Sequence, residues 1–139
     1  MKFSIRQTKN VKLVKKLHDK IFHGVDFPEH IIPTMWIIKD EHGEPAGFCM
    51  TATLIDEGCL FLSRAGVIKK YRGQGLHNRM IKVRERFAKR DELKTILTYT
   101  IKENYSSFSH LIKLGYQLYS PEWEYVGNDV FYFKKDTHE

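Results

Sequence analysis

This sequence of 139 residues has few features that could form a disulfide, bind a metal or span a membrane. Only two cysteines occur, Cys49 and Cys59, and neither belongs to a C-x-x-C or H-x-x-H spacing. They form neither a disulfide framework nor a structural zinc site, and we expect both to be reduced and buried on strands. The longest uncharged, apolar-rich stretch, residues 46–55, is half of the roughly 20 residues that a membrane-spanning helix needs.

Targeting signals and repeats are lacking as well. The first sixteen residues mix basic and apolar groups without the apolar core of a secretory signal, and no segment recurs at a fixed period. Because 42% of the residues are hydrophobic and compact domains mostly contain ~100–150 residues, we expect residues 1–139 to form a single domain. We expect this domain to be cytoplasmic and to have no membrane partner.

Positive charge is abundant, and it is concentrated in one segment. The formal net charge is +6, and residues 69–90 hold nine Lys and Arg against one acidic residue. The other 117 residues carry a net charge of −2. A basic segment of this kind favours an anionic partner, either nucleic acid or a phosphate-rich cofactor.

Hydrophobic periodicity predicts a mixed α/β (α+β) fold in which helices lie on both faces of one sheet. Short, turn-rich loops join three central strands into an antiparallel meander. The expected strands are residues 2–7, 35–39, 46–54, 60–68 and 95–101. The expected helices begin at Thr8 or Asn10, after Gly75 and at Asn104, and the first and last of them end at Gly24 and Gly115. A short extra helix could open near Pro28, and residues 116–133 predict a closing hairpin that turns at residues 127–129.

The stretch from Val67 to His77 carries the strongest functional signal. A strand runs into a basic turn with two glycines, and a helix starts at once. Gly73 and Gly75 can adopt positive φ, and the helix start adds unsatisfied N–H groups, so the turn could cradle a phosphate. It is neither a Walker A nor a G-x-G-x-x-G motif. On the glycines alone, a tight strand–helix turn beside a solvated basic helix face is an equally good interpretation.

Two spacings resemble those of the GCN5-related N-acetyltransferases, the GNAT superfamily. The acetyl-CoA motif of this family is [QR]-x-x-G-x-[GA], preceded by a valine five residues earlier. A second motif places a small residue three positions after an asparagine, and a glycine and an aromatic residue eleven and twelve positions after it. The residues that match are Val67, Arg72 and Gly75 in the first motif, and Asn104, Ser107, Gly115 and Tyr116 in the second.

The resemblance implies an acetyl-CoA-dependent N-acyltransferase that moves an acetyl group from the CoA thioester to an amine by direct attack. The amine, carried by a small molecule or a protein, is not identified, no metal is implied, and a homodimer is possible. The implied fold is a mostly antiparallel sheet of about six to seven strands with one splayed parallel pair, here the strands that end at Val67 and Ile101.

The same resemblance assigns the cofactor contacts. The pantetheine arm would pair with the backbone of Gly66, Val67 and Ile68, and the Val67 N–H would be the oxyanion donor. Asn104 would orient the cofactor, with Ser107 as its small neighbour, although Asn104 could also be a plain helix cap. The pyrophosphate would lie on Arg72 and on the amides of the turn, with further charge from Lys69, Lys70 and Arg79. These amides belong to Gly73, Gln74, Gly75, Leu76 and His77.

The sequence departs from the family pattern at two positions. His77 stands where the first motif ends in Gly or Ala. Leu111 stands where many members have the tyrosine that protonates the departing thiolate, and its neighbour His110 lies about 100° away around the helix. Tyr99 and Tyr105 are the nearby tyrosines that could replace it. Because a thiol with a pKa of ~8.5 leaves readily as a thiolate, the acid could also be dispensable.

The acceptor end of the site is less defined by the sequence. The general base could come from the loop after the first helix, which contains His23, Asp26, Glu29 and His30. Glu57 is excluded, because a hairpin tip ten residues before Val67 lies roughly 30 Å away. Among the aromatic residues of the tail, Trp123 and Tyr125 are the ones expected to wall the acceptor site.

Two other functions remain open at this point. A nucleic-acid-binding module would use the basic face of residues 79–90, although no helix-turn-helix, zinc-finger or RNP pattern accompanies it. A GNAT-fold protein that binds acyl-CoA without catalysis would explain Leu111 at the acid position.

Overall fold

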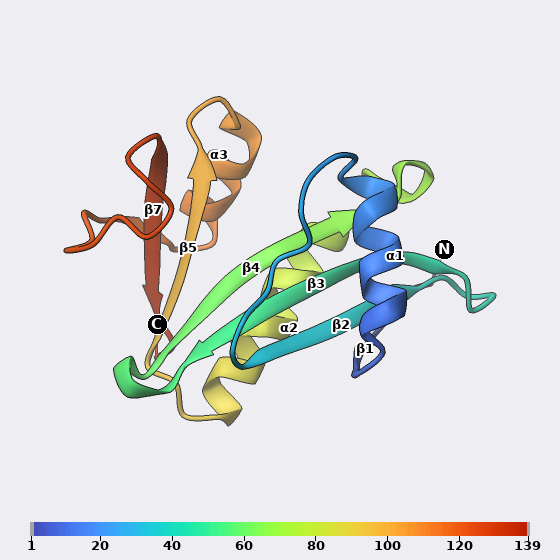
Figure 1. Ribbon diagram of the computed structural model, residues 1–139, viewed down its shortest axis with the longest axis horizontal. Coiled ribbons are helices and arrows are strands. Elements are labelled where there is room, and N and C mark those ends of the chain that lie inside the picture. The colour runs from blue at the N-terminus through green and yellow to red at the C-terminus, as the bar shows by residue number, and fades with distance from the viewer. Residues whose placement is uncertain (1, 139) are drawn as a thin grey trace.

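The computed structural model describes residues 2–138, which fold into one seven-stranded sheet with helices packed against it (Figure 1). The strands are β1 (Ser4–Thr8), β2 (Pro33–Lys39), β3 (Pro45–Leu54), β4 (Cys59–Val67), β5 (Thr95–Ile101), β6 (Gln117–Leu118) and β7 (Val130–Asp136). The helices are α1 (Val11–Ile21), α2 (Leu76–Arg90) and α3 (Tyr105–Lys113), with short 3-10 turns η1 (Ile55–Glu57) and η2 (Lys69–Tyr71).

The sheet has the order β1-β2-β3-β4-β5-β7-β6, and only β4 and β5 run parallel. These two strands pair at three positions, from Cys59 opposite Thr95 to Phe61 opposite Leu97. Beyond that point they diverge, which Figure 1 shows as an open wedge between the two arrows. The prediction of a mostly antiparallel sheet with one splayed parallel pair is therefore confirmed.

A β-bulge in β4 accompanies the divergence. Cys49 of β3 faces Ala65, but Thr51 faces Leu62, so one extra residue of β4 is accommodated between these pairs. A bulge bends its strand and increases the local twist. The bend lies where β4 leaves β5, between Leu62 and Ala65, and it helps to open the wedge.

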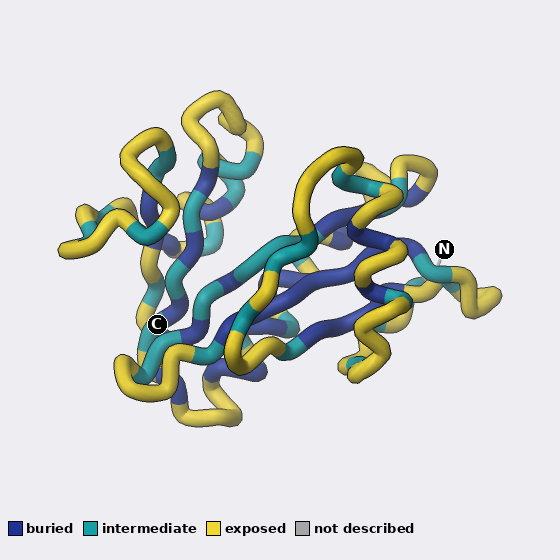
Figure 2. The backbone as a smooth tube through the Cα atoms, viewed as in Figure 1, coloured by how far each residue is buried: buried dark blue, intermediate teal, exposed yellow. Residues whose placement is uncertain are grey.

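Helices cover both faces of the sheet, as predicted. Helix α1 packs on one face through Val14 and Leu17, which join Phe48 of β3 in one cluster. On the opposite face Met80 of α2 packs with Phe133 of β7 in a larger cluster that also includes α3. Figure 2 shows the buried residues along the centres of the strands, with exposed residues in the connecting loops.

The caps of the helices follow the sequence signals. The Asn10 side chain accepts a hydrogen bond from the Leu13 amide at 3.2 Å, and Asn104 accepts one from the Ser107 amide at 3.1 Å. Each bond satisfies one of the free donors at a helix start. Helix α2 begins differently, after Gly75 in the left-handed region (φ 75°) and without a side-chain cap.

Three expectations need correction. Residues 22–32 form no helix; Phe22 and Phe27 pack against the α1 cluster from an irregular segment, and Ile31 is 99% exposed. The tail does form the expected antiparallel pair, β6 with β7, but β6 has only two residues and the loop between them extends well beyond the expected turn at residues 127–129. Cys59 is only half-buried because it begins β4 at the end of the sheet, whereas Cys49 is buried as expected.

None of the described helices combines the length and the apolar composition needed to cross a membrane.

Candidate active-site cleft

A cleft of about 1150 Å³ occupies the wedge between β4 and β5. The start of α2 and helix α3 line it on one face of the sheet, and the end of α1 with the following loop lines it on the other. The cleft therefore passes through the middle of the sheet, where the two parallel strands separate. A ligand lying in it would reach both faces.

The turn before α2 presents a row of free backbone donors to this cleft. Gly73 and Gly75 have φ values of 81° and 75°, and a Cβ at either position would meet no atom within 4 Å. The amides of residues 73–78 donate no hydrogen bond to any described residue, and the first one that does is Arg79, to Gly75 O at 3.2 Å. No acidic residue lies in the first turn of α2. Such a run of amides at a helix N-terminus is suited to an anion.

The end of β4 presents a further backbone donor. Ile68 N–H donates to Ala46 O at 2.8 Å, which makes their positions a hydrogen-bonded pair. Because bonded and non-bonded pairs alternate along antiparallel strands, Val67 opposite Gly47 has its N–H and C=O directed away from β3, towards the wedge. The Val67 carbonyl accepts a hydrogen bond from Arg72 Nε at 3.1 Å. The Val67 N–H donates to no described residue and remains for a ligand.

Three buried polar atoms at the wall of the cleft have no hydrogen-bond partner among the described residues. They are Asn78 Oδ1, Thr100 Oγ1 and His110 Nε2. Buried polar atoms without partners are rare in folded proteins, so this wall fits a polar ligand. His77 lies nearby, and burial together with the charges of Arg84 and His110 lowers the pKa of its imidazole.

Arg84 is a buried residue of the cleft that the sequence interpretation placed on the basic helix face. It is 4% exposed and donates to Met80 O at 3.1 Å, to Met50 O at 3.2 Å and to Ser63 O at 3.3 Å. Since Met50 and Ser63 face each other at the bulge, Arg84 braces the bent part of β4. Its position four residues after Met80, on the apolar face of α2, is the signal that could have identified it.

Phe61 and Tyr99 line the α1 face of the wedge, whereas Tyr125 and Trp123, expected to wall it, pack beside these rings without lining the cleft. The Phe61 ring of β4 stacks on Tyr99 of β5, with centroids 6.1 Å apart, and the edge of Tyr125 packs against it at 5.9 Å. Tyr125 shares a hydrogen bond of 2.9 Å with Tyr119, and its burial is the main reason that the pKa of its hydroxyl is raised. Trp123 packs at the edge of Tyr125 but is largely exposed to solvent.

His30 lies between this aromatic wall and the bulge. Its Nε2 is 2.7 Å from Ser63 Oγ, and its ring contacts the edge of Phe61 at 6.3 Å. Burial, with a smaller effect of the Arg64 charge, lowers the pKa of His30 below its ordinary value of 6.5. The imidazole is therefore a free base at neutral pH. Of the four candidates in this loop, only His30 lines the cleft.

The family model described as "Acetyltransferase (GNAT) family" matches residues 9–116 of the sequence. The chain belongs to this family. Members of the family use acetyl-CoA as a cosubstrate and transfer its acetyl group to an acceptor. No curated protein sequence matches the chain.

Solved structures share the GNAT fold with this chain at low sequence identity. The ribosomal-protein-S18-alanine N-acetyltransferase of Escherichia coli is 14% identical, with 98% of this chain and 94% of that one covered and a TM-score of 0.79. The IAA acetyltransferase of Bacillus cereus is 13% identical, with coverages of 97% and 99% and a TM-score of 0.77. The dodecameric spermidine N-acetyltransferase of Vibrio cholerae is 11% identical, with coverages of 97% and 94% and a TM-score of 0.77.

Most of the residues expected to contact the cofactor or to supply the acid line the cleft. They are Gly66, Val67, Arg72, Gly73, Gly75, Leu76, His77, Tyr99, Asn104 and Ser107. Three others do not line it. Ile68 uses its N–H in the sheet, Gln74 is exposed in the turn, and Tyr105, the first residue of α3, is 76% exposed. The structure thus separates the two acid candidates, because it brings Tyr99 to the cleft and leaves Tyr105 in solvent.

Proposed function

We propose that this GNAT chain is an N-acetyltransferase that binds acetyl-CoA in the β4–β5 cleft and directs an acceptor amine to the thioester. The observation that carries the proposal is the row of free amides over residues 73–78, which opens onto the same cleft as the outward-facing N–H of Val67. A phosphate site and an oxyanion donor thereby share one cavity.

The residues of the cleft fit the cofactor at each of its parts. The amides of residues 73–78 would hold the pyrophosphate, and Arg72 beside them would balance its charge. His110 Nε2 and Asn78 Oδ1 would regain the hydrogen bonds that they lack. Asn104 already caps α3 through Ser107, which leaves its side-chain amide nitrogen available to the cofactor.

Acetyl-CoA supplies a thioester whose carbonyl carbon accepts the amine. The Val67 N–H would donate to the carbonyl oxygen as negative charge develops there during attack, which is the role of an oxyanion donor. The hydrogen bond from Arg72 to the Val67 carbonyl holds this peptide in place before the reaction. Positioning of the amine beside it would supply much of the remaining rate enhancement.

His30 is the general base in this proposal. No Asp or Glu lines the cleft among the residues described, whereas His30 lies at the acceptor face and is neutral at neutral pH because burial lowers its pKa. Its hydrogen bond to Ser63 fixes the ring at the wall. An imidazole in this state can take the amine's proton directly or through a water molecule.

The thiolate needs no dedicated acid in this proposal. Leu111, at the position of the family tyrosine, is buried and apolar. Two tyrosines line the cleft among the described residues, and the hydroxyl of one of them, Tyr71, already donates to Asp40 at 2.6 Å. The other, Tyr99, could donate a proton, and it is stacked on Phe61. With a solution pKa of ~8.5, the CoA thiol can leave as a thiolate, so Tyr99 serves mainly as part of the acceptor wall.

Two measurements on the purified protein test the proposal. Calorimetry should give saturable binding of acetyl-CoA, and a panel of amines should include some that release free thiol from it. Binding without thiol release for any amine would instead favour a non-catalytic acyl-CoA-binding protein. No binding of acetyl-CoA at all would overturn the proposal.

A further inference from the structure

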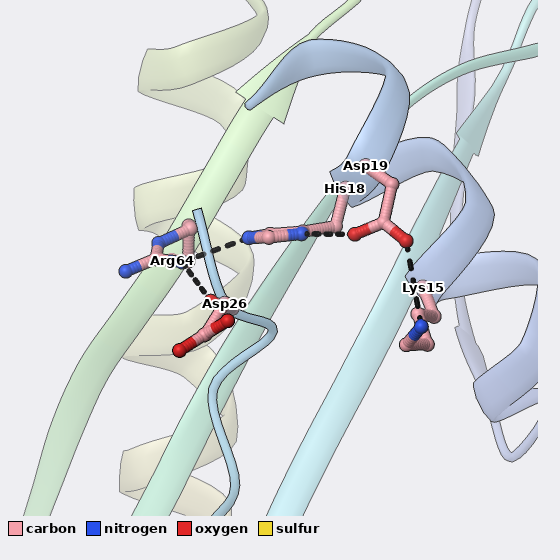
Figure 3. A network of polar contacts seen from close by, with 5 residues as sticks. All are labelled: Lys15, His18, Asp19, Asp26 and Arg64. Atoms are coloured by element: carbon pink, nitrogen blue, oxygen red, sulfur yellow. Dashed lines mark hydrogen bonds and ion pairs between the residues drawn. The ribbon is translucent and has the colours of Figure 1, made fainter. Parts of the chain in front are cut away.

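Arg64 occupies an unusual position on the acceptor face of the cleft. It lies on the bulge of β4 and its side chain crosses to α1, where Nη1 donates to His18 Nε2 and to the carbonyl of Asp26, both at 2.8 Å (Figure 3). Its Nε and Nη2 donate no hydrogen bond to the described residues. The guanidinium is thus fixed at one nitrogen and free at its other edge.

A chain of hydrogen bonds through His18 and Asp19 holds Arg64 in this orientation. His18 is completely buried, and its Nδ1 lies 3.0 Å from a carboxylate oxygen of Asp19 (Figure 3). Because arginine can only donate, His18 Nε2 must accept, and the proton of the ring is therefore on Nδ1 and donated to Asp19. The hydrogen bond from His18 is the main reason that the pKa of Asp19 is lowered. Arg64 is therefore positioned by a neutral ring that does not offset its charge.

The charge of Arg64 has no counterpart in the cleft. Among the described residues none forms an ion pair with it, and Arg64, Arg72, Arg84 and Lys113 line the cleft without any carboxylate. Arg72 directly precedes the amide turn, Lys113 lies in the last turn of α3, and Arg84 is engaged by backbone carbonyls. Arg64 is the cation on the α1 face. The Phe22 ring lies 5.5 Å from Arg64 Cζ but supplies no full negative charge. A partly buried charge without an anionic partner is costly, which favours a ligand that supplies one.

We propose that the acceptor amine carries an anionic group, a carboxylate in a small amino acid-like molecule, and that Arg64 binds it. The inference rests on the proposed function, since it names the class of acceptor for the same cleft. The planar fork of arginine matches a carboxylate with two parallel hydrogen bonds, which its free edge can donate.

The spacing along β4 limits how far apart the two groups of the acceptor can be. Arg64 precedes Val67 by three residues, about 10 Å along a strand. His30 and Ser63 lie beside Arg64, so an amine between His30 and the Val67 amide would be a few bonds from a carboxylate on the guanidinium. The rings of Phe61, Tyr99 and Tyr125 would surround an apolar or aromatic substituent.

Matched pairs of acceptors test this inference. The pairs are phenylalanine with phenylalaninamide, which differ in the carboxylate, and phosphoethanolamine with ethanolamine, which asks whether a phosphate is preferred. For each pair the ratio of kcat/KM is measured on wild type and on Arg64→Gln, with Arg86→Gln on the exposed face of α2 as the control. Comparing the ratio between enzymes cancels the different basicity of the two amines.

We expect Arg64→Gln to lower the ratio of the carboxylate to its amide by at least ~10-fold, about 1.4 kcal/mol, while Arg86→Gln leaves it unchanged. The same loss confined to the phosphate pair would assign the site to phosphates and overturn the carboxylate. An unchanged ratio in both pairs would overturn the inference, as would acceptance of protein substrates only. In those cases thiol release from a neutral amine would still support the proposed function, and calorimetry shows whether Arg64→Gln binds acetyl-CoA normally.

Discussion

The two ends of the cleft present different kinds of groups to a ligand. At the α2 end the donors are backbone amides over one continuous stretch, residues 73–78, and glycines provide the conformation that exposes them. At the α1 end the groups that line the cleft are side chains from separate segments, among them His30 of the loop, Arg64 of β4 and Tyr99 of β5, and His18 of α1 holds Arg64 from behind.

This difference explains why a family signature marks one end and not the other. A backbone cradle depends on local conformation and tolerates many side chains, so a short motif describes it in every member. A side-chain site depends on which segments the fold brings together, and each segment can change independently. The acceptor end is therefore where members of one family can diverge in substrate.

The largest expected effect is on acetyl-CoA binding at the α2 end of the cleft, where the donors are backbone amides. Gly75→Glu should weaken acetyl-CoA binding by about 1000-fold or more, about 4 kcal/mol, because a carboxylate would stand where the phosphates bind. Gly43→Glu is the matched control, since Gly43 also has positive φ (81°) and open space around it, but lies in the β2–β3 turn. Calorimetry measures the acetyl-CoA affinity of both variants. Equal affinities of Gly75→Glu and Gly43→Glu for acetyl-CoA would refute a phosphate cradle at this turn.

Arg84 connects the two ends, and removing it should cost stability. Arg84→Met would leave the carbonyls of Met50 and Ser63 without their donor, and we expect a loss of about 3 kcal/mol in the free energy of unfolding. Arg86→Met, at an exposed position of the same helix, should lose less than about 0.5 kcal/mol. Urea unfolding of the two variants measures the difference, and similar losses in both would exclude a bracing role.

His30 tests whether the acceptor end contains the base. His30→Gln should lower kcat/KM by about 100-fold, about 2.7 kcal/mol, with little change in acetyl-CoA affinity. Because burial lowers the pKa of His30, the acidic limb of the wild-type pH–rate profile should fall below pH 6.5, since the base is protonated only there. The limb should disappear in His30→Gln. An identical limb in both enzymes would assign it to another group.

Tyr99 should have a smaller effect. Tyr99→Phe should lower turnover by less than ~10-fold, about 1.4 kcal/mol, because the ring still stacks on Phe61 and the thiolate leaves without an acid. The matched variant Tyr105→Phe, at an exposed position, should change nothing. The pH–rate profile should stay flat at alkaline pH. A falling alkaline limb that Tyr99→Phe removes would identify Tyr99 as the acid.

The outer face of α2 should contribute least. Lys82, Arg86 and Lys89 are exposed and lie beyond the first turn of the helix, so we expect reversal of all three charges to change saturating turnover of a small amine by less than ~2-fold. Steady-state kinetics with such an amine provides the measurement. A loss above ~100-fold would place this face in the site.

Much of the fold was predictable because its signals are local. The periodicity after Gly75, the β-branched run of residues 95–101 and the asparagine caps each specify an element from neighbouring residues alone. The conformations of residues 22–32 and of the loop between β6 and β7 were not predictable, since distant partners set them. The edge of Tyr125, for example, packs on Phe61 across the sheet, and no nearby residue indicates that contact.

The sequence by itself determined the strand–turn–helix unit and the motif spacings, because positive φ at Gly73 and Gly75 and the free amides of a helix start depend only on adjacent residues. What each charge contacts, by contrast, depends on the tertiary fold. Arg84 and Arg86 are two residues apart, yet one is buried against the bulge and the other is exposed. Arg64 and His18 are 46 residues apart, yet they share a hydrogen bond. Such pairings follow from how the sheet bends and which helix covers it, so no local pattern can indicate them.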